Sequence, residues 1–184
     1  MDELHKQWLE KIASGSESAM SELYHDFESR IYKFAFAKLN NAFEASEILN
    51  EVMMEVWKNA SKYQGKSKVS TWIFSIAHHR TIDLMRKKYR HDFVEEDPEL
   101  ADETSHLDQA ILSSQITDKV QHCIKQLKRP FRDIIHLTFF EELHYSDIAK
   151  ILDCPEGTVK SRVYHAKASL KNCLASLSTI GASI

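Results

Sequence analysis

The sequence predicts an all-α protein of two small helical domains joined by a flexible acidic linker. Three observations favour this fold class. Apolar residues recur at helical spacing along most of the 184-residue chain, and no stretch alternates as a half-buried strand would. Glycine and proline, which interrupt helices, number only four and three. Residues 1–90 contain 14 basic and 12 acidic residues, and residues 115–184 contain ten basic and seven acidic ones. Residues 91–114, between them, contain eight acidic residues and no basic one.

Four helices are predicted in the first domain, residues 1–90. The first covers residues 3–13 and ends at a Ser-Gly-Ser sequence. The second ends at an Asn-Asn pair, and its apolar face is formed by Leu23, Phe27, Ile31 and Phe34. The third covers residues 43–60, with apolar positions Ile48, Leu49, Val52, Met53, Val56 and Trp57. A polar, basic loop at 61–69 precedes the fourth, residues 70–90, which buries Ile73, Ile76, Ala77 and Leu84.

The third helix carries four glutamates opposite its apolar face, namely Glu44, Glu47, Glu51 and Glu55. Each lies about one helical turn from the next, so together they form one acidic ridge. Two interpretations are open. The ridge is either a solvated face or a docking surface for a basic partner.

Basic and aromatic residues are mixed in the loop at 61–69 and the helix at 70–90. The cations are Lys58, Lys62, Lys66, Lys68, Arg80, Arg86, Lys87, Lys88 and Arg90, and the rings are Tyr63, Trp72, Phe74 and Tyr89. Cations that follow phosphates and rings that stack on bases are typical of single-stranded nucleic acid binding. His78, His79 and Asp83 are expected on the outward side of this helix. Alternatively the rings belong to the core, which is the expected place of Phe74, and the cations are merely solvated.

Residues 91–114 contain acidic but no basic residues and few apolar ones, so they are predicted to form a flexible linker. A solvated acidic loop within one domain is the alternative. Cys123, Cys154 and Cys173 are widely spaced, odd in number and lack CxxC spacing, so they are expected to be reduced small apolar residues. The chain start does not resemble a signal peptide, and no apolar run reaches membrane-spanning length.

The second domain is predicted over residues 115–176, followed by a frayed tail at 177–184. Its first helix is indicated by Leu112, Ile116, Val120, Cys123 and Leu127 at helical spacing. A second helix begins at Pro130 and is expected to continue through Phe140. Residues 145–171 then form a helix, a tight turn at Asp153-Cys154 and a final helix with Pro155 at its first position.

This final helix has an apolar stripe of Val159, Val163, Ala166 and Leu170. Opposite the stripe, at about 100° per residue, lie Ser161, Tyr164 and His165. Its flanks are basic through Lys160, Arg162, Lys167 and Lys171. A helix-turn-helix with such a face fits the major groove of DNA, whereas an ordinary amphipathic helix with a solvated basic face is the alternative.

Three segments, in this order and spacing, resemble the extracytoplasmic-function (ECF) sigma factors, group 4 of the sigma-70 family of bacterial promoter-recognition subunits. Residues 44–57 (EASEILNEVMMEVW) resemble the acidic helix of sigma region 2 that docks on the polymerase clamp. Residues 70–87 (STWIFSIAHHRTIDLMRK) resemble the helix that opens and reads the −10 element. Residues 145–171, with GTVKSR at 157–162, resemble the region 4 helix-turn-helix that reads the −35 element. The resemblance covers nearly the whole chain except the linker and the tail.

The resemblance implies an alternative sigma factor that directs core polymerase to promoters by binding, with no catalytic site, cofactor or metal of its own. The implied polymerase-docking residues are Glu44, Glu47, Asn50, Glu51 and Glu55. The implied −10 contacts, including a loop that grips a flipped base, are Tyr63, Lys66, Lys68, Trp72, His79, Asp83, Arg86 and Lys87. The implied −35 contacts are Lys160, Ser161, Arg162, Tyr164, His165 and Lys167.

The implied partners are core RNA polymerase, promoter DNA and an anti-sigma factor, in the cytoplasm and without direct membrane insertion. Several positions depart from the family pattern. Asp153 and Glu142 stand where glycine is frequent, and His144 stands where a serine often caps the next helix. Asp tolerates positive φ better than most residues, so the turn at Asp153 is expected to persist under some strain. His79 and His165 replace a frequent Asn and Arg, which bears on the promoter sequence and not on the fold.

Two other classes of function fit parts of the sequence. The helix-turn-helix alone also fits a free-standing repressor or activator whose first domain senses a signal or dimerises. A helical metal enzyme would use His78, His79, Asp83 and a nearby glutamate, but no HExxH or nucleophile motif accompanies them.

Overall fold

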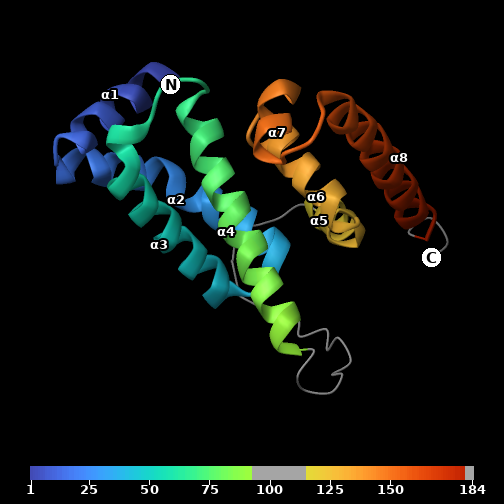
Figure 1. Ribbon diagram of the computed structural model, residues 1–184. Coiled ribbons are helices and arrows are strands. Elements are labelled where there is room, and N and C mark those ends of the chain that lie inside the picture. The colour runs from blue at the N-terminus through green and yellow to red at the C-terminus, as the bar shows by residue number, and fades with distance from the viewer. Residues whose placement is uncertain (93–114, 181–184) are drawn as a thin grey trace.

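The computed structural model describes residues 1–92 and 115–180, and every regular element within these ranges is a helix (Figure 1). This confirms the predicted all-α class. Apart from residues 91 and 92, which end a helix, the predicted linker lies outside the described residues. Within the described ranges, no helix has both the length and the apolar character needed to cross a bilayer.

The first helical unit contains α1 (Asp2–Ala13), α2 (Glu17–Leu39), α3 (Ala42–Asn59), a short 3₁₀ turn η1 (Ala60–Lys62) and α4 (Val69–Asp92). Local side chains define the helix starts. The Ser16 hydroxyl accepts a hydrogen bond from the backbone N–H of Ala19, and Asn41 Oδ1 accepts one from Glu44. Between α2 and α3, Asn40 takes a left-handed conformation with φ of 50°, which asparagine tolerates well.

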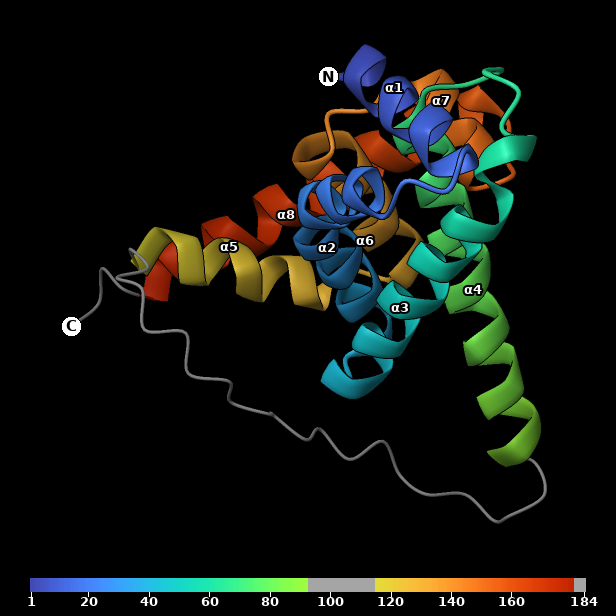
Figure 2. The ribbon, with the colours of Figure 1, turned by 90° about the vertical axis from the view of Figure 1, so that its left-hand side faces the viewer.

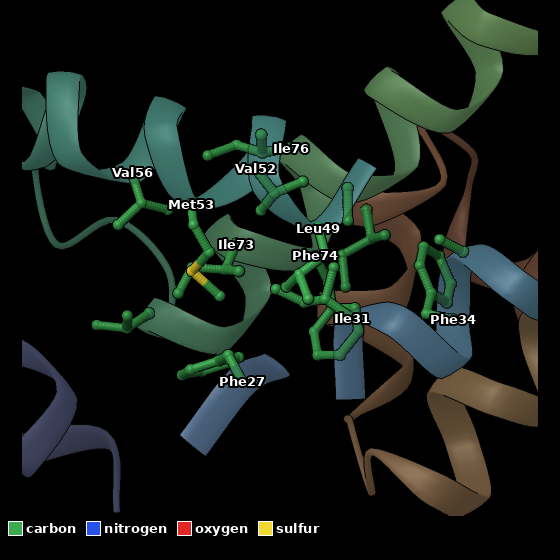
Figure 3. Close-up of a cluster of buried hydrophobic side chains, with 14 of the residues drawn as sticks. Phe27, Ile31, Phe34, Leu49, Val52, Met53, Val56, Ile73, Phe74 and Ile76 are labelled. Atoms are coloured by element: carbon green, nitrogen blue, oxygen red, sulfur yellow. The ribbon is translucent and has the colours of Figure 1, made fainter. Parts of the chain in front are cut away.

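The apolar faces predicted for α2, α3 and α4 meet in one core (Figure 3). From α2 come Phe27, Ile31 and Phe34; from α3 Leu49, Val52, Met53 and Val56; and from α4 Ile73, Phe74 and Ile76. The rings of Phe34 and Phe74 meet edge to face at 5.4 Å. Phe74 is therefore a core residue, as expected.

The second helical unit contains α5 (Gln115–Gln126), α6 (Arg129–Ile135), a π-helical segment η2 (His136–Phe140), α7 (Tyr145–Ile151) and α8 (Glu156–Ile180). Pro130 lies in the first turn of α6, where its missing N–H needs no partner. The helix predicted through Phe140 is thus α-helical only to Ile135. Helix α8 extends to Ile180, into the segment expected to fray.

Three departures from the family pattern have visible backbone consequences. Glu142 and Asp153 adopt positive φ, at 51° and 47°, where glycine is frequent in the family. His144 is the N-cap of α7 but makes no side-chain capping hydrogen bond. The turn expected to persist at Asp153 is present with positive φ, and the side-chain cap at His144 is absent, as expected.

The prediction of three unpaired cysteines was wrong for two of them. Cys123 of α5 and Cys173 of α8 form a disulfide, with their Cα atoms 5.8 Å apart, while Cys154 is free. A small apolar cluster of Leu127, Ile135 and Ala166, against which Ile124 of α5 also packs, joins α5, α6 and α8. This packing brings together two cysteines that are 50 residues apart in sequence, a pairing that no local spacing indicates.

The two helical units pack directly against each other. Helix α7 lies beside α4, and α6 lies beside α2 (Figures 1 and 2). The core of the first unit continues without a break into the second, where it includes Ile134, Leu137, Leu143, Ile148, Ile151, Val159 and Val163.

Candidate nucleic-acid and polymerase interfaces

The loop between α3 and α4 is held by specific contacts. The Tyr63 hydroxyl donates to the Ser67 carbonyl, and the backbone N–H of Val69 donates to Asp2 Oδ1 at 3.0 Å. The Tyr63 ring packs on the Trp72 ring, with centroids 5.3 Å apart. Burial raises the pKa of Tyr63. Lys66, in the middle of the loop, and Lys68, next to the start of α4, are both exposed to solvent.

Three of the expected −10 residues, Trp72, His79 and Asp83, line one surface cavity of about 420 Å³ beside that loop. The His79 Nδ1–H donates to the Ser75 carbonyl at 2.7 Å, which leaves Nε2 of a neutral ring as a free acceptor. Asp83 adds carboxylate acceptors, and the half-buried Trp72 adds the accessible part of its indole ring. The cavity therefore offers an aromatic surface and two polar acceptors to a flat polar group.

Two other expected −10 residues, Arg86 and Lys87, lie further along α4 and are exposed. Lys87 lines a neighbouring cavity of about 160 Å³ with Asp83. The expectation that His78 faces outward was wrong, because its side chain is buried. His78 lies one turn after the core residue Phe74, so it shares the buried face of α4.

The acidic ridge of α3 divides into two parts. Glu55 and Glu44 form ion pairs with α4, the first with Arg80 at 2.7 Å and the second with Lys88. Glu47, Asn50 and Glu51 are exposed. Among the described residues, Glu44 and Glu55 of the ridge are therefore neutralised by α4, and Glu47 and Glu51 carry the charge available to a partner.

An apolar groove next to Asn50 was not predicted from the sequence. It has a volume of about 510 Å³ between α2 and α3 and is lined by Glu17, Met20, Tyr24, Asn50, Met53, Met54 and Trp57. Met54 is 53% exposed although it is apolar. Its position three residues before Trp57, just outside the buried stripe of α3, was the signal that could have revealed the groove.

Helix α8 packs on its own unit through the buried Val159, Val163 and Ala166, so the opposite face points to solvent. Of the six expected −35 residues, Lys160, Ser161, Tyr164, His165 and Lys167 are exposed, and the Tyr164 side chain is 72% exposed. Arg162 is half-buried and turned toward the first unit. Phe139, also missed, is exposed beside this face and lies 5.1 Å below the Lys167 ammonium.

Comparison with known proteins decides the family. The sigma-70 region 2 model matches residues 23–91, and the sigma-70 region 4 model matches residues 117–170. The ECF RNA polymerase sigma factor SigW of Bacillus subtilis is 26% identical, covering 96% of this chain and all of SigW. The chain belongs to the ECF sigma factors.

A second relative agrees in sequence, and two solved structures agree in fold. SigK of Mycobacterium tuberculosis is 29% identical over 90% of this chain and 91% of its own length. CnrH, solved with the cytosolic domain of CnrY, superposes with a TM-score of 0.66 at 15% identity, covering 94% and 98% of the two chains. RpoE of Bartonella quintana, solved with the anti-sigma factor NepR, also gives 0.66 at 22% identity, covering 84% and 97%. The region 2 match covers most of α2, α3 and α4, and the region 4 match covers most of α5 to α8.

Proposed function

We propose that this ECF sigma factor reads the −10 element as a single strand in region 2 and the −35 element as a duplex with α8, while bound to core polymerase. It acts by binding, without a catalytic step of its own. The observation that supports this best is the cavity lined by Trp72, His79 and Asp83, beside the Tyr63 loop. It combines an aromatic wall with acceptors, as recognition of an unstacked base requires.

In region 2, the proposed phosphate contacts are Lys66 and Lys68 of the loop and Arg86 and Lys87 of α4, all of which are exposed. Taking a base out of its stack costs a few kcal/mol, which stacking and hydrogen bonds in the cavity offset. Acceptors at His79 Nε2 and Asp83 favour bases with amino groups on the exposed edge.

In region 4, the exposed face of α8 supplies Ser161, Tyr164 and His165 to base edges, flanked by Lys160 and Lys167 for phosphates. Each good pairing between a side chain and a base contributes ~1–3 kcal/mol of discrimination. Arg162 has to turn away from region 2 before it reaches DNA.

For polymerase docking, we propose that the exposed Glu47, Asn50 and Glu51 act together with the Met54–Trp57 groove. A partner that fits both features is a basic helical segment of the polymerase clamp with apolar anchors, and methionines adapt well to such anchors.

We further propose an anti-sigma factor that covers this docking surface. Two proteins of the same fold were solved with a partner, CnrH with the cytosolic domain of CnrY and the sigma factor RpoE with the anti-sigma factor NepR. Polymerase and promoter DNA are cytoplasmic in bacteria, so the proposed place of action is the cytoplasm.

Run-off transcription with core polymerase on a randomised promoter library tests the proposal. We expect sigma-dependent transcripts from promoters that share two short elements at fixed separation. The alternative, a free-standing regulator, predicts tight dimeric binding to a palindrome without polymerase. That result, together with no sigma-dependent transcript, would overturn the proposed function.

A further inference from the structure

The first helix of the chain holds the start of α4, the helix that carries the proposed −10 cavity. Asp2 Oδ1 of α1 accepts a hydrogen bond from the backbone N–H of Val69 at 3.0 Å, across 67 residues of sequence. Val69 is the first residue of α4, so its N–H is one of the donors that find no acceptor within the helix. The preceding Lys68 has only donors on its side chain and cannot accept this bond. Asp2 therefore caps α4 from a different helix (Figure 1).

Helix α1 is itself attached to the rest of the first unit. Leu9 and Ile12 are buried in the core, and His5 is buried beside them. The His5 imidazole lies 3.0 Å from Asp26 Oδ2 of α2, and its ring centroid lies 5.0 Å from that of Phe27. Because these contacts anchor α1 to α2, the first turn of α1 is a fixed point against which the start of α4 is held.

The loop between α3 and α4 has little packing of its own. Residues 64–66 are exposed, and the hydrogen bond from the Tyr63 hydroxyl to the Ser67 carbonyl closes the loop on itself. Two contacts join the loop to the helices: the Tyr63 ring packs on the Trp72 ring, and Asp2 holds the residue at which α4 begins. The position of the loop therefore depends on contacts at its two ends.

The Asp2 carboxylate also lies within electrostatic range of the aromatic side of the cavity. Burial is the main cause of the raised pKa of Tyr63, the Asp2 charge raises this pKa further, and the Lys6 charge opposes both. Lys6 Nζ lies 3.3 Å from Asp2 Oδ2, so each oxygen of the carboxylate has its own partner. The Tyr63 ring packs on Trp72, which lines the cavity. One side chain of α1 is thus coupled to both ends of the loop.

We propose that Asp2 is a positioning residue for −10 recognition, which holds the first turn of α4 and the Tyr63 loop in the conformation that receives an unstacked base. This inference rests on the proposed function and extends it to α1, which precedes the region 2 match at residues 23–91. Trp72 lies in the first turn of α4, so unwinding of this turn displaces the aromatic wall of the cavity. Single-stranded DNA then binds only the fraction of molecules whose first turn is ordered, and the apparent affinity falls by that fraction.

The test compares the full-length wild type with Asp2→Ala, with any affinity tag placed at the C-terminus. Glu3→Ala is the matched control, because Glu3 lies in the same helical turn and also pairs with Lys6, but its side chain is 79% exposed. Asp2→Asn is the rescue variant, since its amide oxygen can accept the Val69 hydrogen bond without a charge. Hydrogen–deuterium exchange of the free chain should be faster at the start of α4 in Asp2→Ala, and not in Glu3→Ala or Asp2→Asn.

Binding of the holoenzyme to a partly single-stranded promoter fragment gives the functional readout. The fragment carries the −35 element as duplex and the −10 element as a single strand, with sequences taken from the run-off selection. Asp2→Ala should bind about fivefold more weakly, the change expected when one helix cap is lost. Asp2→Asn and Glu3→Ala should bind within about twofold of wild type. Affinity for core polymerase, and for a fragment that lacks the −10 strand, should stay the same in all variants.

Unchanged exchange at the start of α4, or unchanged binding of the single-stranded −10 element, overturns the inference. An equal loss of core affinity also overturns it, because Asp2 would then serve only the stability of the whole unit. If circular dichroism shows that Asp2→Ala is unfolded, Asp2→Gln, whose longer side chain displaces the acceptor, is compared with Glu3→Gln instead. If the wild-type holoenzyme binds no promoter fragment, the proposed function fails and the role of Asp2 in reading fails with it, while the exchange still shows whether Asp2 orders the loop.

Discussion

At the residue scale, His78 makes stability depend on pH. Burial, followed by the Lys38 and His79 charges, lowers its pKa to about 3 from 6.5. Between these values the unfolded chain binds a proton that the folded chain does not, so stability is complete above pH 6.5 and falls as the pH drops toward 3. Asp133 and Arg129 of α6 and Arg162 of α8 face the same cavity.

We therefore expect the free energy of unfolding to decrease from pH 7 to pH 5 in wild type, and less steeply in His78→Asn. The Asn carbonyl replaces the imidazole acceptor for Lys38 without titrating. The slope should not vanish, because burial also lowers the pKa of His5. Urea denaturation at several pH values measures both slopes, and equal slopes would contradict the assignment.

His79 is expected to matter for promoter opening and not for folding, since its side chain is exposed. His79→Ala should reduce run-off transcription about 5- to 150-fold, the equivalent of ~1–3 kcal/mol of recognition. His25→Ala is the control, because His25 is an exposed histidine on α2, far from the cavity in sequence. If both variants transcribe like wild type and melt at the same temperature, His79 does not read the promoter.

The two histidines show what the sequence could and could not give at this scale. Adjacent helical residues point about 100° apart, so His78 and His79 cannot both face outward in the same direction. The spacing from Phe74 is consistent with His78 on the core side, but the nearby cations led to the prediction that His78 faces outward. Its actual partner, Lys38, lies 40 residues away on another helix, which no local pattern reveals.

At the scale of elements, the disulfide between α5 and α8 should stabilise region 4. A cross-link that closes a loop of about 50 residues contributes up to ~4 kcal/mol through the unfolded chain, and measured values are often lower. Adding a reductant to wild type should therefore lower the melting temperature. Cys154→Ser, which leaves the disulfide in place, should respond to the reductant as wild type does. If the reductant leaves the melting temperature unchanged, the disulfide contributes nothing to the stability of region 4.

The groove between α2 and α3 predicts a separate effect on polymerase binding. Met54→Arg should weaken core binding about tenfold or more, since a charge enters an apolar anchor site. Phe43→Arg is its control, because Phe43 is an exposed apolar residue of α3 outside the groove. Titration of labelled core polymerase measures both affinities, and equal affinities would exclude the groove from docking.

At the scale of the whole molecule, the sequence predicts the helices well and their assembly less well. The stripes of α2, α3 and α4 identify core residues because burial follows helical periodicity. The same stripes do not indicate which other helix packs against each of them. Because an acidic stretch separates the two units in sequence, Ile148 and Ile151 were predicted to belong to a separate domain. In the structure they share one core with Phe34.

The widened turn at His136–Phe140 has a consequence for how the two units are coupled. The backbone N–H of Glu141 bonds to the His136 carbonyl five residues earlier, so this segment holds one residue more per turn than an ordinary helix. That extra residue sets the direction of the Glu141 carboxylate. Losing a single codon here would rotate Glu141 by about 100° and part it from Arg30. Sequence length at this one turn can therefore decide whether Glu141 of the second unit reaches Arg30 of the first.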